Sequence, residues 1–249
     1  AAILSVSEGM NELLIPHLKI STRPDIVAND PLVEGQQPCS RNLRKDCGID
    51  SSTPLLVYSG AVAPQRGVGD VLTALRVMPD GHLALIANPS NATVQKYVAD
   101  FSDLKDRFHV LPYVPNSELV SYLSDADIGL IPIHHKLNHE ISLITKFGEY
   151  MQARLPIVVS DVRTMSAEVR RLGNGEVFIA EDIQDFVRAT RAVLSNLEKY
   201  RNGYTTSVLA ERSWERQAEN LIALYNRIAS VNPTPREHRP FQLSQPERI

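Results

Sequence analysis

Short apolar runs alternate with longer amphipathic segments from about residue 54 onward. Each run is rich in Val, Ile or Leu and has the length of a strand buried on both faces of a sheet. These runs are residues 55–58, 83–86, 108–111, 128–131, 157–159 and 176–179. Helical periodicity follows each run, at 67–78, 92–104, 116–125, within 140–156, at 165–172 and in three pieces between 182 and 229. This alternation predicts an α/β fold: a Rossmann-like, doubly wound sheet of six parallel strands with helices on both faces.

The loops after the first and fourth strands are the places where a ligand is expected. In a sheet with strand order 3-2-1-4-5-6, ligands bind where the order reverses, beside the carboxyl ends of these two strands. The loops are residues 59–67 and 132–142, and the second leads into residues 140–161. This stretch predicts a loop, a helix capped by Ser142, a tight turn and a buried strand. Glu149 lies opposite the apolar stripe of that helix, so it is either solvated or turned toward the ligand.

The two ends of the chain carry other patterns. Ser5 and Glu8 have the spacing of a capping box, with Ser5 as the cap, which predicts a helix to about residue 14. An extended piece is expected at 25–29, and residues 32–53 are polar with one short basic helix. The tail from residue 232 holds four prolines and many charges, which predicts a loose extension.

Composition narrows the class of protein. A hydrophobic content of 43% predicts a packed core, and a net charge of −3 argues against a nucleic-acid surface. No apolar run approaches the roughly 20 residues that a membrane span needs. Cys39 and Cys47 do not have the spacing of a zinc site, so two free thiols in a reducing compartment are expected.

The loop after the first strand has the residue types of a phosphate site. Gly60 lets the backbone turn tightly at the strand end. Arg66 and Gly67 place a guanidinium beside a helix N-terminus, and both features attract phosphate oxygens. The loop is neither a Walker A sequence nor Gly-x-Gly-x-x-Gly, and a surface arginine is the alternative.

The loop after the fourth strand offers further groups for an anion. Free amides are expected at the helix start between Ser142 and Thr145, where Ser142, Thr145 and Lys146 add side-chain donors. Three histidines lie in the same loop, namely His134, His135 and His139. They lack a carboxylate at helical spacing, so no metal site is expected, and they are interpreted as solvated or as contacting substrate.

The remaining groups suit a nucleotide. A carboxylate such as that of Glu149 can accept two hydrogen bonds from a ribose diol. In the loop after the third strand, the backbone of Tyr113 and Val114 can pair with the edge of a flat base, although a plain connector is equally consistent. No Ser/His/Asp order and no Gly-x-Ser-x-Gly elbow is present.

These residues resemble a known family. Residues 145–161, Thr-Lys-Phe-Gly-Glu-Tyr-Met-Gln-Ala-Arg-Leu-Pro-Ile-Val-Val-Ser-Asp, are similar to the donor-site signature of retaining glycosyltransferases with the GT-B fold. That large group, group 1 or family 4-like, contains bacterial mannosyl- and glucosyltransferases. Further matching pieces occur in the family's order: 5–8, 26–29, the loop 60–67, 126–132, 173–175, and 213–215 before a final helix.

The resemblance implies a division of the chain. It would be the C-terminal, donor-binding half of such an enzyme. Residues 1–30 would be a remnant or linker from the N-terminal half, 31–230 the nucleotide-sugar-binding domain, and 231–249 the loose tail. The acceptor would bind in a missing N-terminal domain, so this chain is expected to bind a nucleotide sugar but to transfer little or none alone. A cytoplasmic location is expected, with peripheral association at the inner membrane face left open.

The resemblance also implies roles for individual residues. Glu149 would hold the ribose and Arg66 the diphosphate. The amides of Ser142, Leu143 and Ile144 would also touch the diphosphate, and the Tyr113 and Val114 backbone would contact the base. A hexose would be transferred with retention at the anomeric carbon. No metal or other cofactor would take part, and stabilisation of the departing diphosphate would be the main catalytic effect.

Two positions depart from the family pattern. Many relatives carry a second glutamate, which contacts the donor sugar, eight residues before the first. That position is Ile141 here, and Glu140, the candidate catalytic residue, lies one residue away. Ala61 replaces an arginine common after the glycine. The alternatives are an enzyme like the non-hydrolysing nucleotide-sugar epimerases, with loop histidines and Glu140 as acid and base, or a non-catalytic nucleotide-binding module.

Overall fold

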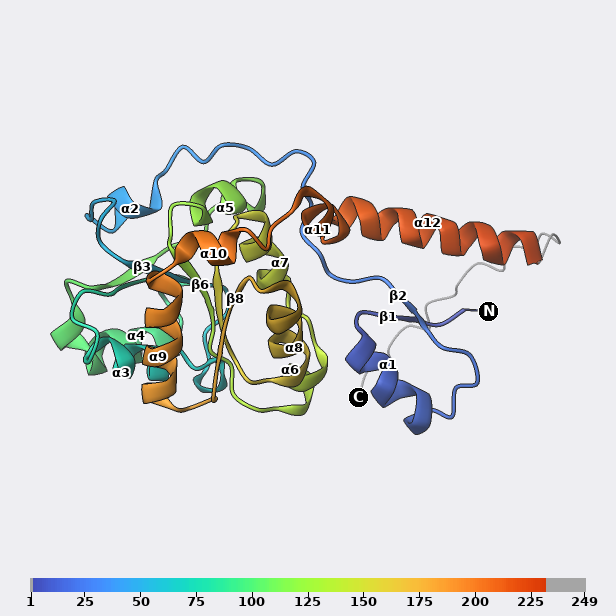
Figure 1. The fold of residues 1–249 in the computed structure, drawn as a ribbon, viewed down its shortest axis with the longest axis horizontal. Coiled ribbons are helices and arrows are strands. Elements are labelled where there is room, and N and C mark those ends of the chain that lie inside the picture. The colour runs from blue at the N-terminus through green and yellow to red at the C-terminus, as the bar shows by residue number, and fades with distance from the viewer. Residues whose placement is uncertain (1, 232–249) are drawn as a thin grey trace, which may run out of the picture.

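A six-stranded parallel sheet forms the centre of the molecule in the computed structural model, which describes residues 2–231 (Figure 1). The strands are β3 (Leu55–Ser59), β4 (His82–Ile86), β5 (Phe108–Leu111), β6 (Ile128–Ile131), β7 (Ile157–Ser160) and β8 (Gly175–Phe178). Their order is β5-β4-β3-β6-β7-β8, and every neighbouring pair is parallel. This is the predicted order 3-2-1-4-5-6, so the α/β prediction is confirmed.

Helices cover both faces of the sheet and bury the alternate side chains of its strands (Figure 1). On one face, α3 (Val68–Leu75), α4 (Ala92–Asp100) and α9 (Ile183–Leu194) pack with Leu56 and Tyr58. On the other, α5 (Asn116–Leu123), α7 (Thr145–Gln152) and α8 (Arg163–Leu172) pack with Leu55 and Val57. The shorter elements are α2 (Leu43–Asp46), η1 (Pro64–Arg66), η2 (Ser102–Leu104), α6 (Leu137–Ile141), α10 (Leu197–Arg201) and α11 (Thr206–Glu211).

Tyr150 on α7 locks this helix against the carboxyl ends of the central strands. Its hydroxyl accepts a hydrogen bond from the Ser59 amide at 3.1 Å and lies 3.2 Å from the Val57 carbonyl, to which it can donate. A Cβ atom at Gly129 would lie 2.5 Å from the Tyr150 ring, so this close approach requires glycine. The start of α7 is therefore held firmly at the point where the strand order reverses.

The opening residues form a small unit of two strands and a helix. Strand β1 (Leu4–Ser5) pairs in parallel with β2 (Asp25–Ile26), and α1 (Glu8–His17) lies between them in sequence. The predicted cap is wrong by two residues, because the Ser7 hydroxyl accepts from the Met10 amide at 3.1 Å. The Ser5 hydroxyl instead donates to the side chain of Asn11, inside the unit.

Long-range contacts fasten this unit to the rest of the chain. Its α1 packs on α6, where the Gly9 backbone lies against Ile141. The last helix, α12 (Trp214–Val231), extends from the sheet toward β1 and β2 (Figure 1). Arg227 on α12 binds Asp25 at 2.6 Å. The division into 1–30, 31–230 and 231–249 stays a prediction, and the tail expected to be loose lies outside the described residues.

Several helix boundaries in the structure differ from the predicted ones. The helix expected at 67–78 is η1 followed by α3, and the one at 92–104 is α4 followed by η2. Ser142 does not cap a helix, because the short α6 precedes it and α7 begins only at Thr145, after Ile144. The predicted C-cap at Gly173 is confirmed, with a left-handed φ of 64° after α8.

Two further features bear on the class of protein. Cys47 is buried, Cys39 is half-buried, and neither is paired with the other. Within residues 2–231, no helix is both long enough and apolar enough to cross a bilayer.

Candidate functional site

A pocket of about 480 Å³ lies at the carboxyl ends of β3 and β6, where the strand order reverses. It is lined by Val6, Asn29, Ser59, Gly60, Ala61, Arg66, Tyr113, Val114, Asn116, Leu119, Ser142, Leu143, Ile144, Thr145, Lys146 and Glu149. All predicted donor-binding residues except Gly67 are in this set. The fold thus brings three separate loops to one cavity, and the binding roles of these residues stay predictions.

The start of α7 presents a run of free amides to this pocket. Within the described part of the chain, the backbone N–H groups from Ser142 to Lys146 have no hydrogen-bond acceptor. Ile144, the residue before the helix, has no side chain that could cap them. Free amides at a helix N-terminus attract an anion, so this edge of the pocket suits a phosphate group.

Lys146 forms the floor of the pocket beside Gly60. Its Nζ lies 3.4 Å from the centre of the Tyr58 ring, a cation–π contact. A Cβ atom at Gly60, whose φ is 120°, would lie 3.6 Å from that Nζ. Burial, and then the charge of Arg66, hold the pKa of Lys146 well below its usual value, while Glu149 opposes this shift. A bound anion would relieve the unfavourable burial of this ammonium group.

Arg66 reaches the pocket from η1, and the neighbouring backbone ties its loop to the loop after β6. Gly67 has a φ of 71°, and a Cβ atom there would lie 1.7 Å from the Pro132 carbonyl oxygen. The His134 amide also donates to the Gln65 carbonyl at 3.0 Å. Gly67 therefore does not line the pocket but allows the close contact between the two loops, which holds the Arg66 backbone in place.

Glu149 faces the same pocket from the next turn of α7 and is half-buried. Its carboxylate has no hydrogen-bond partner among residues 2–231. Burial raises its pKa, while the nearby Lys146 lowers it. Glu149 thus lies at the pocket rather than on a fully exposed helix face, and a ligand with hydroxyl donors would satisfy this carboxylate.

The side of the pocket expected to hold a base includes residues that the sequence analysis did not single out. Tyr113, 53% exposed, and Val114 lie beside Asn116 and Leu119 from the first turn of α5. Asn116 follows this loop directly in the sequence, and this position is the one local sign that it lies near the site. Val6 and Asn29 come from the β1–β2 unit, and no local pattern indicates that they reach the site.

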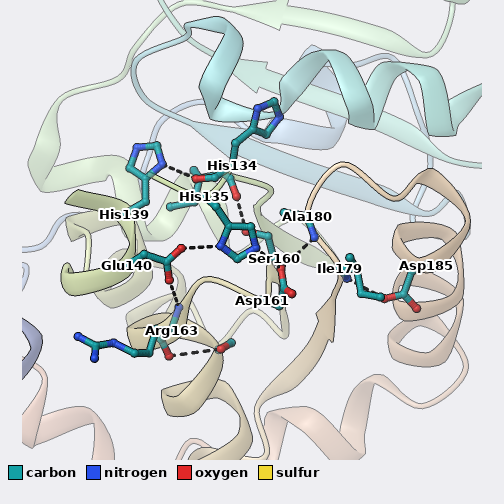
Figure 2. Close-up of polar contacts among 12 residues, drawn as sticks. His134, His135, His139, Glu140, Ser160, Asp161, Arg163, Ile179, Ala180 and Asp185 are labelled. Carbon is teal, nitrogen blue, oxygen red and sulfur yellow. Dashed lines mark hydrogen bonds and ion pairs between the residues drawn. The ribbon is translucent and has the colours of Figure 1, made fainter. Parts of the chain in front are cut away.

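Glu140 does not line this pocket but belongs to a separate set of polar contacts (Figure 2). Its carboxylate binds His135 Nδ1 and accepts from the Arg163 amide at 2.8 Å, the first amide of α8. His135 Nε2 contacts Asp161 at 2.9 Å, and Asp161 accepts from the Ala180 amide. We call Glu140, His135 and Asp161 the carboxylate cluster. It joins α6, β7 and α8, and the catalytic role of Glu140 stays a prediction without support from its position.

The three loop histidines have separate environments. The bond from Glu140 is the main reason that the pKa of His135 is raised. His134 Nε2 lies 2.7 Å from Asp70, and His139 Nδ1 lies 2.7 Å from the His134 carbonyl oxygen. Within the described chain, no group of three or more His, Cys, Asp or Glu side chains has the arrangement of a metal site.

Comparison with known families decides what kind of protein carries this pocket. The model of the family described as "Glycosyl transferases group 1" matches residues 40–207, about two thirds of the chain. The chain belongs to this family. The match covers most of the sheet and the loops that build the pocket, apart from the β1–β2 unit and α12.

Two curated proteins are similar to this chain and carry related names. TuaC of Bacillus subtilis, provisionally named a teichuronic acid biosynthesis glycosyltransferase, is 23% identical over 135 residues, which are 54% of this chain and 31% of TuaC. An uncharacterized glycosyltransferase of Methanocaldococcus jannaschii is 21% identical over 194 residues, which cover 74% of this chain and 47% of that protein. The chain therefore matches less than half the length of either relative.

Solved structures share the fold of this chain. Sucrose-phosphate synthase of Thermosynechococcus elongatus has a TM-score of 0.73 at 17% identity, covering 93% of this chain and 59% of that one. Anabaena HepE, solved in complex with UDP, has a TM-score of 0.74 at 12% identity, covering 91% and 64%. At these identities the likeness shows the fold, which is the α/β architecture of GT-B glycosyltransferases.

Proposed function

We propose that this chain is the donor-binding half of a retaining glycosyltransferase and that the pocket at the β3–β6 switch binds a nucleotide-diphospho-sugar. One observation carries the proposal: free amides, two cationic side chains and an unpartnered carboxylate line the same cavity. Amides and cations suit a diphosphate, and the carboxylate suits a ribose diol. The family membership supports sugar transfer.

Each part of the donor has a complementary part of the pocket. The diphosphate binds the amides of Ser142, Leu143 and Ile144, together with Arg66 and Lys146. The ribose binds Glu149. The base lies against the exposed loop of Tyr113 and Val114. Anabaena HepE has been solved with UDP and with UDP-glucose, which supports a nucleotide sugar as the ligand class.

The proposed reaction transfers the sugar, a hexose, with retention at the anomeric carbon and without a metal. As the bond to the diphosphate breaks, negative charge grows on the departing oxygen. The amides before α7 and the Arg66 guanidinium are already in place to stabilise that charge. The acceptor binds in a further, N-terminal domain, so this chain alone transfers little sugar. We place the enzyme in the cytoplasm, with the full protein able to bind at the inner membrane face.

The alternatives gain no support from the site. An epimerase would use Glu140 and the loop histidines as acid and base, but Glu140 and His135 bind each other outside the pocket. The family membership likewise favours transfer over epimerisation.

Calorimetry with UDP, GDP, ADP and dTDP tests the proposal. One of these diphosphates is expected to bind, and its nucleoside to bind much more weakly because the amides and cations contact the phosphates. Glu140→Ala serves as the matched control, since its carboxylate lies outside the pocket. Absence of binding by all four diphosphates, or equal binding of the nucleoside, would contradict the proposal.

A further inference from the structure

A second recess shares Arg66 with the proposed donor pocket. It measures about 650 Å³ and lies between η1 and the loop leading into α6. Besides Arg66, its polar lining comprises Gln65, His134, Lys136, Asn138 and His139. If Arg66 holds the terminal phosphate from the donor pocket, a group esterified to that phosphate can extend into this recess.

His139 has the features of a hydrogen-bond acceptor kept ready for a ligand. The residue is only 3% exposed and lines the recess. Because a carbonyl oxygen only accepts, the 2.7 Å contact with the His134 carbonyl means that Nδ1 carries the proton. In the neutral ring Nε2 then keeps its lone pair, and it has no hydrogen-bond partner within residues 2–231. Figure 2 shows this ring turned toward the His134 carbonyl and away from the Glu140 carboxylate.

The other groups of the recess complement a hydroxyl-rich ligand. Asn138 and Gln65 are exposed and offer amide oxygens and amide donors. Lys136 and Arg66 form no ion pair in the described part of the chain. His134 differs, because Asp70 binds its Nε2 at 2.7 Å. The recess therefore combines acceptors for sugar hydroxyls with unpaired positive charge near the phosphate.

We propose that this recess receives the transferred sugar and that His139 Nε2 accepts a hydrogen bond from one of its hydroxyls. The inference rests on the proposed function and names the sugar-contacting residue for it. Family resemblance puts a sugar-contacting glutamate at position 141, but Ile141 is 5% exposed and its side chain has no acceptor. His139, on the same short helix, offers its Nε2 as an acceptor instead.

Paired affinities for a diphosphate and its sugar ester test this inference on the full 249-residue chain. The probes are UDP with UDP-glucose, GDP with GDP-mannose, ADP with ADP-glucose and dTDP with dTDP-glucose, measured by calorimetry. His139→Ala is expected to weaken binding of a sugar ester about three- to tenfold, the effect of one hydrogen bond. It should leave the affinity for the matching diphosphate within about twofold.

Control variants distinguish loss of a direct contact between His139 and the sugar from a change in the structure of the loop. His135→Ala, in the carboxylate cluster, should change neither affinity, because His135 lines neither cavity. If His139→Ala fails to fold, the exposed pair Lys136→Ala and Asn138→Ala gives the same test. The inference is overturned if the ratio of sugar-ester affinity to diphosphate affinity is the same in the folded recess variants as in wild type.

The same experiment distinguishes failure of the proposed function from failure of this inference. If no diphosphate binds, or if Glu149→Ala leaves diphosphate binding unchanged, the donor pocket itself is wrong. If diphosphate binding requires Glu149 but the affinity for the sugar esters does not change in His139→Ala, only the further inference fails.

Discussion

The pocket at the ends of β3 and β6 and the carboxylate cluster both include residues between 132 and 161 but differ in how their polar groups are satisfied. In the cluster, Glu140 and His135 bind each other and nearby backbone or Asp161. In the pocket, the amides before α7 and the carboxylate of Glu149 have no acceptor or donor within residues 2–231. The Nζ atom of Lys146 contacts the face of the Tyr58 ring.

This difference indicates which of the two regions can bind a ligand. Polar groups that line a pocket and have no partner in the protein can bind a complementary ligand. The carboxylate cluster is complete by itself and connects helices. Glu140 and Glu149 lie nine residues apart but are expected to act differently. Substitution of Glu140 should lower stability, whereas substitution of Glu149 should weaken ligand binding.

Removing the pocket carboxylate is the strongest test of the comparison. Glu149→Ala should lower the affinity for the nucleoside diphosphate that binds by about 1.5–3 kcal/mol, the contribution of hydrogen bonds to a charged group. Calorimetry measures this change. A 2′,3′-dideoxy analogue, which lacks both hydroxyls, should bind wild type and variant equally. A loss of the same size with the analogue would show that Glu149 does not act through the ribose.

Removing the pocket arginine should have a somewhat smaller effect. Arg66→Ala is expected to weaken diphosphate binding about tenfold, or about 1.4 kcal/mol, because the amides and Lys146 still hold the phosphates. The loss should shrink as salt increases, since salt screens the charge interaction. Arg76→Ala, at the end of α3 and paired with Asp103, is the matched control. Equal losses in both variants would point to general electrostatics rather than a phosphate contact.

Breaking the carboxylate cluster should change stability but not binding. Glu140→Ala removes the acceptor for the first amide of α8, whose preceding residue, Val162, offers no side-chain oxygen. Loss of such a cap costs about 1 kcal/mol of unfolding free energy, measurable by chemical denaturation. Weaker nucleotide binding with unchanged stability would instead assign Glu140 to the donor site.

The smallest expected effect depends on pH. The pKa of His135 is raised above its ordinary 6.5, chiefly by the bond to Glu140, so its charged form stabilises the fold. This contribution is complete below pH 6.5 and disappears as pH rises through the raised value. Burial raises the pKa of Glu140, but the Arg163 amide and His135 lower it below 4.5, so Glu140 stays ionised above that pH.

Thermal unfolding of His135→Gln at two pH values checks this linkage. The variant should melt below wild type at pH 6 and approach wild type at pH 8.5. Glu149→Gln provides the comparison, because Glu149 is not part of the cluster. A melting difference for His135→Gln that is larger at pH 8.5 would contradict the assigned ion pair.

The sequence by itself determined the sheet and its ligand crevice. Runs such as 128–131 and 157–159 indicated strands because β-branched and aliphatic residues buried on both faces leave a local pattern. The alternation with helices then predicted the strand order, and the order predicted the crevice. Arg66 and Lys146 could be singled out because they lie on or beside predicted loops, and Glu149 because it lies opposite the apolar stripe of the helix that follows.

Only the tertiary structure decided which polar groups are satisfied. Ser7 donates its hydroxyl proton to the carbonyl of Ile141, which fastens the β1–β2 unit beside the pocket. Glu140 turns to α8 because the amide of Arg163 lies within reach, and His139 Nε2 has no hydrogen-bond partner among residues 2–231. These outcomes depend on groups far apart in sequence, which periodicity does not record. Local patterns specify burial, whereas hydrogen-bond partners are set by packing between distant segments.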